Sequence, residues 1–530
     1  MGGDTAPPAA IRWLPALIVV ALTVVGIVFR VLVADQSIFA DELSTYWISA
    51  THGLGGVLSL LYGRGRITHA EITPPLSFLL SWLTTRVGHS PELLRLPSLI
   101  TGAATIPLVY RLGLRTVGRR AALVATALAS FSPFMIYYSA NARAYALMMF
   151  AVVVSTLAML QALDTGRTRW WVLYAVSACA AFYSHYTCVF VLAGQLLWLL
   201  WARPEARRAM LVASAAAAVG VLPWTPGLIN DYRSPTLKIL SALSPFTAGD
   251  IRIDLGHWLI GYPETFAGGL SRLPGTIALI LFAVAVAIAA AGLASALRGA
   301  PVRAQLAGID RRVALIIGLA LATPVAEFVL GAAGNSVFSV RDLAASWPYL
   351  ALTGAAALAV LPARAGTFAA GLAVLAFAVG AVKLLSAPFQ RPDYQGAASY
   401  ITQNARPGDV VVDETGALSP GPLTGLDVSL HRRLPIFRAE APAERDHPFG
   451  FLDPIIPLQQ GVNAAVAAAR GHRVFLVSNV FATDIAGLAA RVDPAPSQFP
   501  ARYRLTAERA YAGIGDTLVA VYADVGAQPK

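Results

Sequence analysis

Charged residues are scarce in this sequence. Asp, Glu, Lys and Arg together make up 13% of the 530 residues, whereas 56% are hydrophobic, and the mean hydropathy is +0.62. This composition excludes an ordinary water-soluble domain. The charged residues that are present lie between apolar runs of about 17 to 23 residues, the length that a helix needs to cross a bilayer. The sequence therefore predicts a polytopic α-helical membrane protein.

Cysteines and nucleotide-binding motifs are also rare or missing. Cys179 and Cys188 are the two cysteines, and they match no metal or redox spacing. A Walker phosphate loop and a Gly-x-Gly-x-x-Gly turn before a helix are absent, so a nucleotide donor is not indicated. The net charge of +11 comes from arginines dispersed among loops. This dispersal argues against a nucleic-acid partner.

Eleven apolar segments are predicted to span the membrane. The first is longer than the apolar core of a typical signal peptide and precedes a poor cleavage site, so we expect an uncleaved span. With a cytoplasmic N-terminus every inner loop carries arginine, as the positive-inside rule requires. Scarce lysine beside abundant Arg and Ala favours a GC-rich bacterial source, and hence the cytoplasmic (inner) membrane. The segments are residues 13–34, 94–113, 121–138, 145–163, 170–185, 186–202, 209–226, 274–297, 313–330, 346–362 and 366–386.

An odd number of spans delivers the end of the chain outside the cytoplasm. The composition changes near residue 388, and no further span follows. Helix-then-strand order is predicted at 393–414 and again at 464–479, with another strand at 517–524. We therefore expect a small extracytoplasmic α/β domain after the membrane domain. The two expected domains are residues 1–387 and 388–530.

Four segments face outward in this threading. They are residues 35–93, 139–144, 227–273 and 331–345. The run Pro74–Gly88 in the first outer loop is apolar but too short to span, so we expect it to lie in the interface or dip back. The third segment is rich in Trp and Tyr, which either hold a sugar or lipid tail or mark the membrane interface.

Acidic residues gather in the first outer loop. Asp41 and Glu42 follow the first span, and Glu71 lies further along. An ionised group this close to hydrocarbon is costly unless it is paired or used, although a loop acid can also be merely solvated. A carboxylate near an acceptor hydroxyl can act as a general base, and neighbouring carboxyls can orient the acceptor or raise the pKa of the base. These three acids are the predicted catalytic residues.

Arginines on the same side suggest a phosphate ligand. Arg143 and Arg341 lie at outer junctions between apolar runs, where the positive-inside trend would not put them, and Arg64 and Arg66 lie in the first outer loop. Guanidinium groups bind phosphate through planar, bidentate hydrogen bonds. The alternatives are an arginine that reaches out to the interface or a structural ion pair, for instance Arg341 with Asp342. We predict that these arginines bind the phosphate of a donor.

Three further residues are candidates for substrate contact: His69, Tyr145 and His185. A lone histidine is more often a hydrogen-bonded structural residue than a catalyst. No group of side chains has dedicated metal-ligand spacing, so no metal site is predicted, but paired carboxylates could take up a divalent cation.

Carboxylates and arginines on one membrane face suit a reaction in which a hydroxyl attacks and a lipid phosphate leaves. Sugar transfer from a polyprenyl-phosphate carrier fits, because the base takes the acceptor proton while arginines neutralise the departing phosphate. The same charges could instead line the path of a transporter or flippase for lipid-linked sugars, which should show mid-span ionisable residues and two repeated halves. Glu327 is one mid-span acid, and the acidic motif is not repeated. An inactive relative that binds glycolipid is a third alternative.

Three motifs in order resemble those of the GT-C glycosyltransferases, in the branch of the protein O-mannosyltransferases and the lipid A aminoarabinose transferase (glycosyltransferase family 39). They are FADELSTYW, HAEITPPLSFLL and FSPFMIYYSANARAYAL, and YSHYT and SVRDLAASWPYLAL add to the likeness, which covers about residues 10 to 390. The resemblance implies that Asp41 is the catalytic aspartate, with Glu42 beside it and Glu71 before the paired prolines. It also implies inverting transfer of mannose, arabinose or a similar sugar to a hydroxyl of a glycan, lipid or protein acceptor, on the outer membrane face, for building the cell envelope.

Two departures from the family pattern bear on the donor sugar. Thr73 stands where the aminoarabinose branch has a lysine, so phosphate binding must rest on arginines or on another contact. Asn141 stands where many relatives carry an acid, which removes a second carboxylate. The reaction class is less affected than the sugar.

Overall fold

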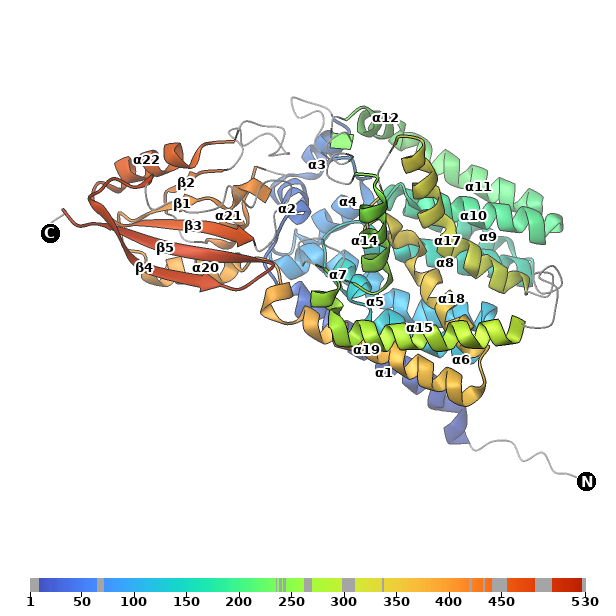
Figure 1. Cartoon of the computed structure of the whole chain (residues 1–530). Helices are drawn as coiled ribbons and strands as arrows, with labels where there is room; N and C mark the ends of the chain where they lie inside the picture. Colours follow the sequence, from blue (N-terminus) through green and yellow to red (C-terminus); the bar gives the residue numbers. More distant parts are fainter. Residues whose placement is uncertain are drawn as a thin grey trace, which may run out of the picture.

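The computed structural model divides into a helical bundle and a sheet domain (Figure 1). The sheet domain lies at one end of the bundle, which we call the sheet-domain end. The structure describes residues 9–63, 71–234, 236–237, 241, 245–261, 269–297, 310–335, 338–418, 422–431, 434–440, 455–481 and 498–526.

Seven helices among the described residues are long and apolar enough to cross a membrane. A bent pair, α6 (Arg119–Phe131) and α7 (Pro133–Ser139), makes an eighth if it counts as one span. The prediction of a polytopic helical protein is confirmed. The seven are α1 (Ala9–Ala34), α5 (Pro91–Thr116), α8 (Tyr145–Thr165), α11 (Arg207–Val221, within a longer candidate span, Pro204–Arg233), α15 (Thr276–Leu297), α17 (Arg311–Ala332) and α19 (Ala363–Leu384).

Three shorter helices coincide with the remaining predicted spans: α9 (Thr168–Ser184), α10 (Cys188–Ala202) and α18 (Trp347–Ala359). The 13 residues of α18 extend about 20 Å at 1.5 Å per residue, less than the hydrocarbon thickness. The count of eleven spans therefore stays a prediction.

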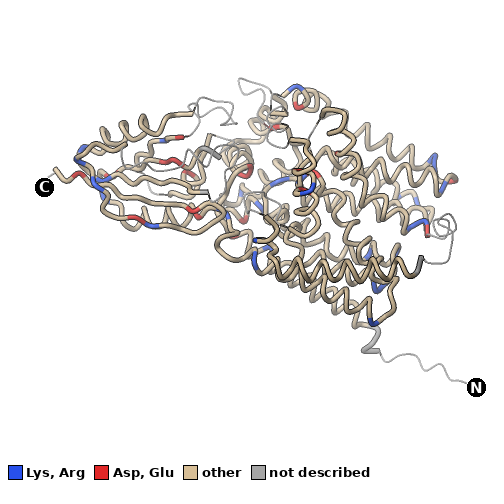
Figure 2. The backbone as a smooth tube through the Cα atoms, in the orientation of Figure 1, with Lys and Arg blue, Asp and Glu red and all other residues tan. Residues whose placement is uncertain are grey.

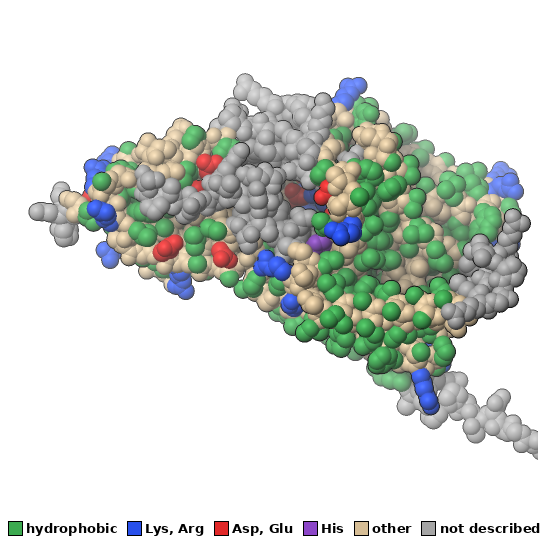
Figure 3. Space-filling view, viewed as in Figure 1, with side chains coloured by type: hydrophobic (Ala, Val, Ile, Leu, Met, Phe, Trp, Pro, Cys, Tyr) green, Lys and Arg blue, Asp and Glu red, His purple; other side chains and the backbone are tan. Residues whose placement is uncertain are grey.

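The surface of the bundle is largely apolar. Figure 3 shows hydrophobic side chains over most of its visible face, and Figure 2 shows Lys and Arg at the end opposite the sheet domain. Leu17, Val212 and Ile277 are among the exposed large hydrophobic residues. Such a surface suits contact with lipid, where helices satisfy their own backbone hydrogen bonds. The protein is thus a multi-pass membrane protein, and the side of the membrane that each terminus occupies stays a prediction.

A buried arginine stabilises the break between α6 and α7, which bends by 58°. Pro133 begins α7 and cannot donate a backbone hydrogen bond. Arg30 of α1 donates to the carbonyls of Ala129 and Ser130 and to the hydroxyl of Ser139. Because these groups lie on both sides of the break, Arg30 fixes the direction in which α7 leaves the bundle.

Short helices lie at or near the sheet-domain end (Figure 1). The apolar run Pro74–Gly88 forms α4, which packs against α2 and α5 with Phe78 buried beside Trp47 and Ile48. Of these helices, α2 carries the acidic motif and begins next to the sheet domain. The short helices are α2 (Asp41–Thr51), α3 (Leu54–Leu61), α4 (Leu76–Thr84), α12 (Thr225–Arg233) and α14 (Ala248–Leu259).

The C-terminal domain is a five-stranded mixed sheet with strand order β2-β1-β3-β5-β4. β1 runs parallel to both β2 and β3, and β5 is antiparallel to β3 and β4. α22 packs on one face of the sheet, while α20 and α21 pack on the other. The predicted helix-then-strand order is present twice, and the boundary at residue 387 stays a prediction. The elements are α20 (Tyr394–Asn404), β1 (Val410–Asp413), α21 (Gly425–Ser429), β2 (Ile436–Arg438), α22 (Leu458–Ala469), β3 (Val474–Phe481), β4 (Tyr503–Tyr511) and β5 (Gly515–Asp524).

Candidate active site

The acidic motif lies at the start of α2. Ala40 precedes the helix with φ 50° and ψ −129°, a backbone conformation that favours glycine. Such a residue carries local strain of about 1–3 kcal/mol and persists only where its surroundings hold it. Asp41 and Glu42 form the first turn of α2, where the helix dipole favours negative charge. The two neighbouring carboxylates nevertheless have different environments.

Asp41 has an accessible carboxylate and an arginine partner. Its Oδ2 lies 3.0 Å from Nη1 of Arg341, which directly precedes the 3-10 helix Asp342–Ser346. The side chains of Asp41 and Arg341 are 42% and 32% exposed. An exposed ion pair contributes little to stability, about 0–1 kcal/mol. The pair therefore brings together a predicted base and a predicted phosphate ligand at a place that solutes can reach.

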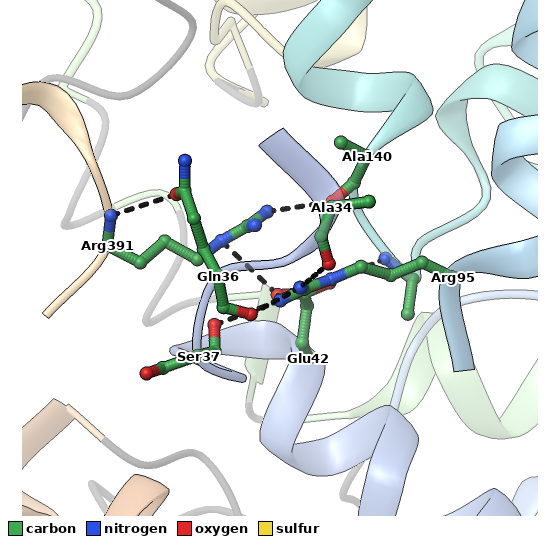
Figure 4. A network of polar contacts seen from close by, with 8 residues as sticks. Ala34, Gln36, Ser37, Glu42, Arg95, Ala140 and Arg391 are labelled. Atoms are coloured by element: carbon green, nitrogen blue, oxygen red, sulfur yellow. Dashed lines mark hydrogen bonds and ion pairs between the residues drawn. The ribbon is translucent and has the colours of Figure 1, made fainter. Parts of the chain in front are cut away.

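Glu42 is fully buried between two arginines (Figure 4). Arg95 of α5 donates to both carboxylate oxygens, at 2.7 and 2.6 Å. Nε of Arg391 lies 3.3 Å from Oε2, and the backbone N–H of Ala142 donates to Oε1 at 2.7 Å. Burial alone would raise the pKa of Glu42, but Arg391 and Arg95 hold it below its ordinary value. Glu42 is thus an ionised group that a substrate does not reach in this conformation.

Arg95 joins the end of α1 to α2. It donates to the backbone carbonyls of Ala34, Gln36 and Ser37 at 2.5–2.9 Å and holds Glu42 as described (Figure 4). The sequence prediction missed Arg95. Its signal was an arginine at the outer end of a predicted span, where the positive-inside trend would not put it.

Glu71 and Arg143 form a second, buried pair. Nη1 and Nη2 of Arg143 donate to the two carboxylate oxygens at 2.8 and 2.9 Å, and Nη2 also donates to the hydroxyl of Thr73. Ser44 of α2 donates to Glu71 at 3.1 Å, which links the pair to the helix of Asp41. Burial would lower the pKa of Arg143, but the carboxylates of Glu71 and Asp41 raise it above its ordinary value. Phosphate binding by Arg143 stays a prediction, because its donors are engaged with Glu71.

Tyr145 and His185 lie beside the Arg341 segment. Their ring centroids are 5.2 Å apart, and Nε2 of His185 is 3.7 Å from Oδ1 of Asp342. Nδ1 of His185 lies 3.0 Å from the hydroxyl of Thr187. Tyr145 and His185 therefore both lie near the Asp41–Arg341 pair, with His185 held by structural partners.

Three predicted site residues, Arg64, Arg66 and His69, lie outside the described residues. In the part of the chain that the structure describes, no group of three or more His, Cys, Asp or Glu side chains is arranged to hold a metal ion. The uptake of a divalent cation by the paired carboxylates stays a prediction.

Comparisons with known proteins bear on the fold. The family described as dolichyl-phosphate-mannose-protein mannosyltransferase matches residues 73–228, which include Arg143, Tyr145 and His185. The crystal structure of ArnT from Cupriavidus metallidurans bound to undecaprenyl phosphate is similar at a TM-score of 0.54 and 13% identity, over 98% of this chain and 100% of that one. The chain has the fold of the GT-C glycosyltransferases.

Other GT-C structures are similar at lower scores. An oligosaccharyltransferase from Archaeoglobus fulgidus, tethered to an acceptor peptide, gives a TM-score of 0.48 at 14% identity over 88% of this chain and 69% of that one. The mycobacterial arabinofuranosyltransferase AftD gives 0.42 at 16% identity over 97% and 40%. A search of curated protein sequences gave no match.

Proposed function

We propose that the protein transfers a sugar from a polyprenyl-phosphate carrier to an acceptor hydroxyl, with inversion and with Asp41 as general base. The observation that carries this proposal is the difference among the three predicted catalytic acids. The side chain of Asp41 is 42% exposed, whereas those of Glu42 and Glu71 are 1% and 5% exposed and are held by arginines. Of the three acids, Asp41 is therefore the one whose carboxylate can touch an acceptor.

The reaction follows from the pair of Asp41 and Arg341. The acceptor oxygen attacks the anomeric carbon while the Asp41 carboxylate takes its proton. The bond from that carbon to the phosphate oxygen breaks, and its electron pair leaves with the lipid phosphate. Arg341 lies next to the base and neutralises the departing charge, a contribution that is large where water is partly excluded. Attack opposite the leaving phosphate inverts the anomeric configuration.

Glu71 and Arg143 support this chemistry in two ways: through their contact with α2 and through the positive charge of Arg143. Ser44 of α2 donates a hydrogen bond to Glu71 of this buried bidentate pair. The pair therefore stays beside the helix that begins with Asp41. The guanidinium of Arg143 remains charged and adds positive potential for the lipid phosphate. Glu42 acts through Arg95 and Arg391 to orient the first turn of α2.

The donor and acceptor classes rest on the resemblance and the matches. A dolichyl-phosphate-mannose family model and an undecaprenyl-phosphate-bound neighbour both support a polyprenyl-phosphate donor. The proposed sugar is mannose, arabinose or a similar one, and the acceptor is a glycan, lipid or protein on the outer face of a bacterial cytoplasmic membrane.

The test is an activity assay with a panel of donors. Purified protein in lipid nanodiscs is incubated with radiolabelled polyprenyl-phosphate mannose, arabinose and related sugars, and released lipid phosphate is measured. Asp41→Asn should lower turnover by about 100- to 10,000-fold. The matched control is Asp164→Asn, which changes an arginine-paired aspartate at the far end of the bundle. Lack of turnover by the wild type with every donor, or equal turnover by Asp41→Asn, would overturn the proposal.

A further inference from the structure

The sheet domain contacts the chain on both sides of Asp41. On the N-terminal side, Phe39 is buried together with Tyr394 of α20 and Ile514, and Ala40 packs against this cluster. The backbone N–H of Gln395 donates to the hydroxyl of Ser37 at 3.2 Å. The residues just before the strained Ala40 are therefore held by the sheet domain.

On the C-terminal side of Asp41, the contact is made by Arg391, in the segment that joins α19 to α20. Nε of Arg391 lies 3.3 Å from the Glu42 carboxylate, and Nη2 donates to the carbonyl of Ala140 at 3.1 Å. Its backbone N–H donates to the side chain of Gln36 (Figure 4). The guanidinium also lies over the ring of Tyr137, 5.2 Å from the centroid. One residue thus ties the domain junction to α2, to α7 and to the end of α1.

A third contact comes from α21. Val428 packs against a cluster of buried residues that includes Ile38, Leu43 and Leu94. Leu43 is the second residue after Asp41, so the apolar side of the same turn is covered by the sheet domain as well. The sheet domain and its junction therefore contribute both polar and apolar contacts to this turn.

We propose that the sheet domain holds the Asp41 turn in its reactive geometry, with Arg391 as the positioning residue. This inference rests on the proposed function. The strained conformation of Ala40 needs fixed residues on either side, and Phe39 and Glu42 are the two that the sheet domain and Arg391 hold. Without Arg391, Glu42 is held by Arg95 and Ala142 alone, so the turn moves more freely and the Asp41 carboxylate faces the acceptor less often.

The test compares Arg391→Met with Arg473→Met. Arg473 is a matched control because it pairs with Asp409 at 2.7 Å and lies over the ring of Phe475, but within the sheet domain and away from α2. Arg391→Met should lower kcat by about 10- to 100-fold while the donor KM stays within about twofold. Arg391→Lys should recover part of the rate, because lysine restores the charge but not the planar fork. Equal kcat in the two Met variants would overturn the proposal.

Hydrogen–deuterium exchange gives a readout that does not depend on activity. Amide exchange in residues 38–46 should rise at least about tenfold in Arg391→Met and stay unchanged in Arg473→Met, because the local opening energy of that turn falls. Unchanged exchange in this segment would contradict the positioning role. If the wild type transfers no sugar, the proposed function fails and the exchange measurement still decides whether Arg391 holds the turn.

Discussion

Asp41 and Arg341 are separated by 300 residues in the sequence, yet Oδ2 of the carboxylate lies 3.0 Å from Nη1 of the guanidinium. One residue opens α2 and the other precedes the segment that leads into α18. The proposed base and the proposed phosphate ligand therefore lie side by side.

Replacing Arg341 tests the phosphate contact. Arg341→Met should weaken binding of a polyprenyl phosphate about tenfold or more, since a charge-assisted hydrogen bond of about 1.5–3 kcal/mol is lost. The measurement is the Kd for undecaprenyl phosphate in nanodiscs. Arg115→Met, which removes an arginine paired with Asp164 at the far end of the bundle, is the control. An unchanged Kd in Arg341→Met would remove this arginine from the phosphate site.

Breaking the buried pair of Glu71 and Arg143 should destabilise the protein. Glu71→Gln leaves the buried guanidinium of Arg143 without its counter-charge, which costs about 3–5 kcal/mol. Arg115→Met breaks a partly exposed pair and should cost about 0–1 kcal/mol. Thermal unfolding in one detergent compares the two. The double variant Glu71→Gln/Arg143→Met should regain part of the loss, and a further fall in Tm would show that the pair is not the cause.

The carboxyl group of Asp254 is expected to make the stability of the protein decrease as the pH rises. Burial and the neighbouring charges of Asp250 and Asp342 raise its pKa from 3.8 to about 7. Because the folded state favours the protonated acid, its contribution to stability is present below the unfolded pKa and is lost as the pH rises through about 7. Relative to the wild type, Asp254→Asn should therefore gain stability between pH 5 and pH 8. A Tm difference that does not change over this range would contradict the assignment.

Much of the bundle could be predicted. A membrane-spanning helix must satisfy its own backbone hydrogen bonds in lipid, and the long apolar run that this requires is visible in the hydropathy of the sequence. The span predicted at 145–163 is α8, and the other predicted spans also coincide with helices. The span predicted at 121–138 is bent at Pro133, which the Ser132-Pro133 dipeptide could have indicated. Helix length, which decides whether α18 crosses the membrane alone, depends on contacts that hydropathy does not report.

The sequence predicted acids and arginines on one face, and the structure shows the pairs that they form. Placing Asp41 and Arg341 on one membrane face required only the order of the spans. Which arginine meets which acid depends on the turns of α2, α5 and α7 that come together, so the pairs Glu42–Arg95 and Glu71–Arg143 had no linear signal. Arg391 lies where the membrane domain ends, and nothing local marks it as a partner of Glu42.

The backbone conformation of Ala40 links the stability of the folded protein to its proposed activity. Glycine at this position would adopt φ 50° without a Cβ penalty, so a variant selected for heat resistance is expected to acquire it. The same glycine would also give the turn many more backbone shapes and would let Asp41 point elsewhere. Alanine keeps a costlier turn with a single direction, so a heat-resistant variant that carries glycine at position 40 is expected to lose turnover.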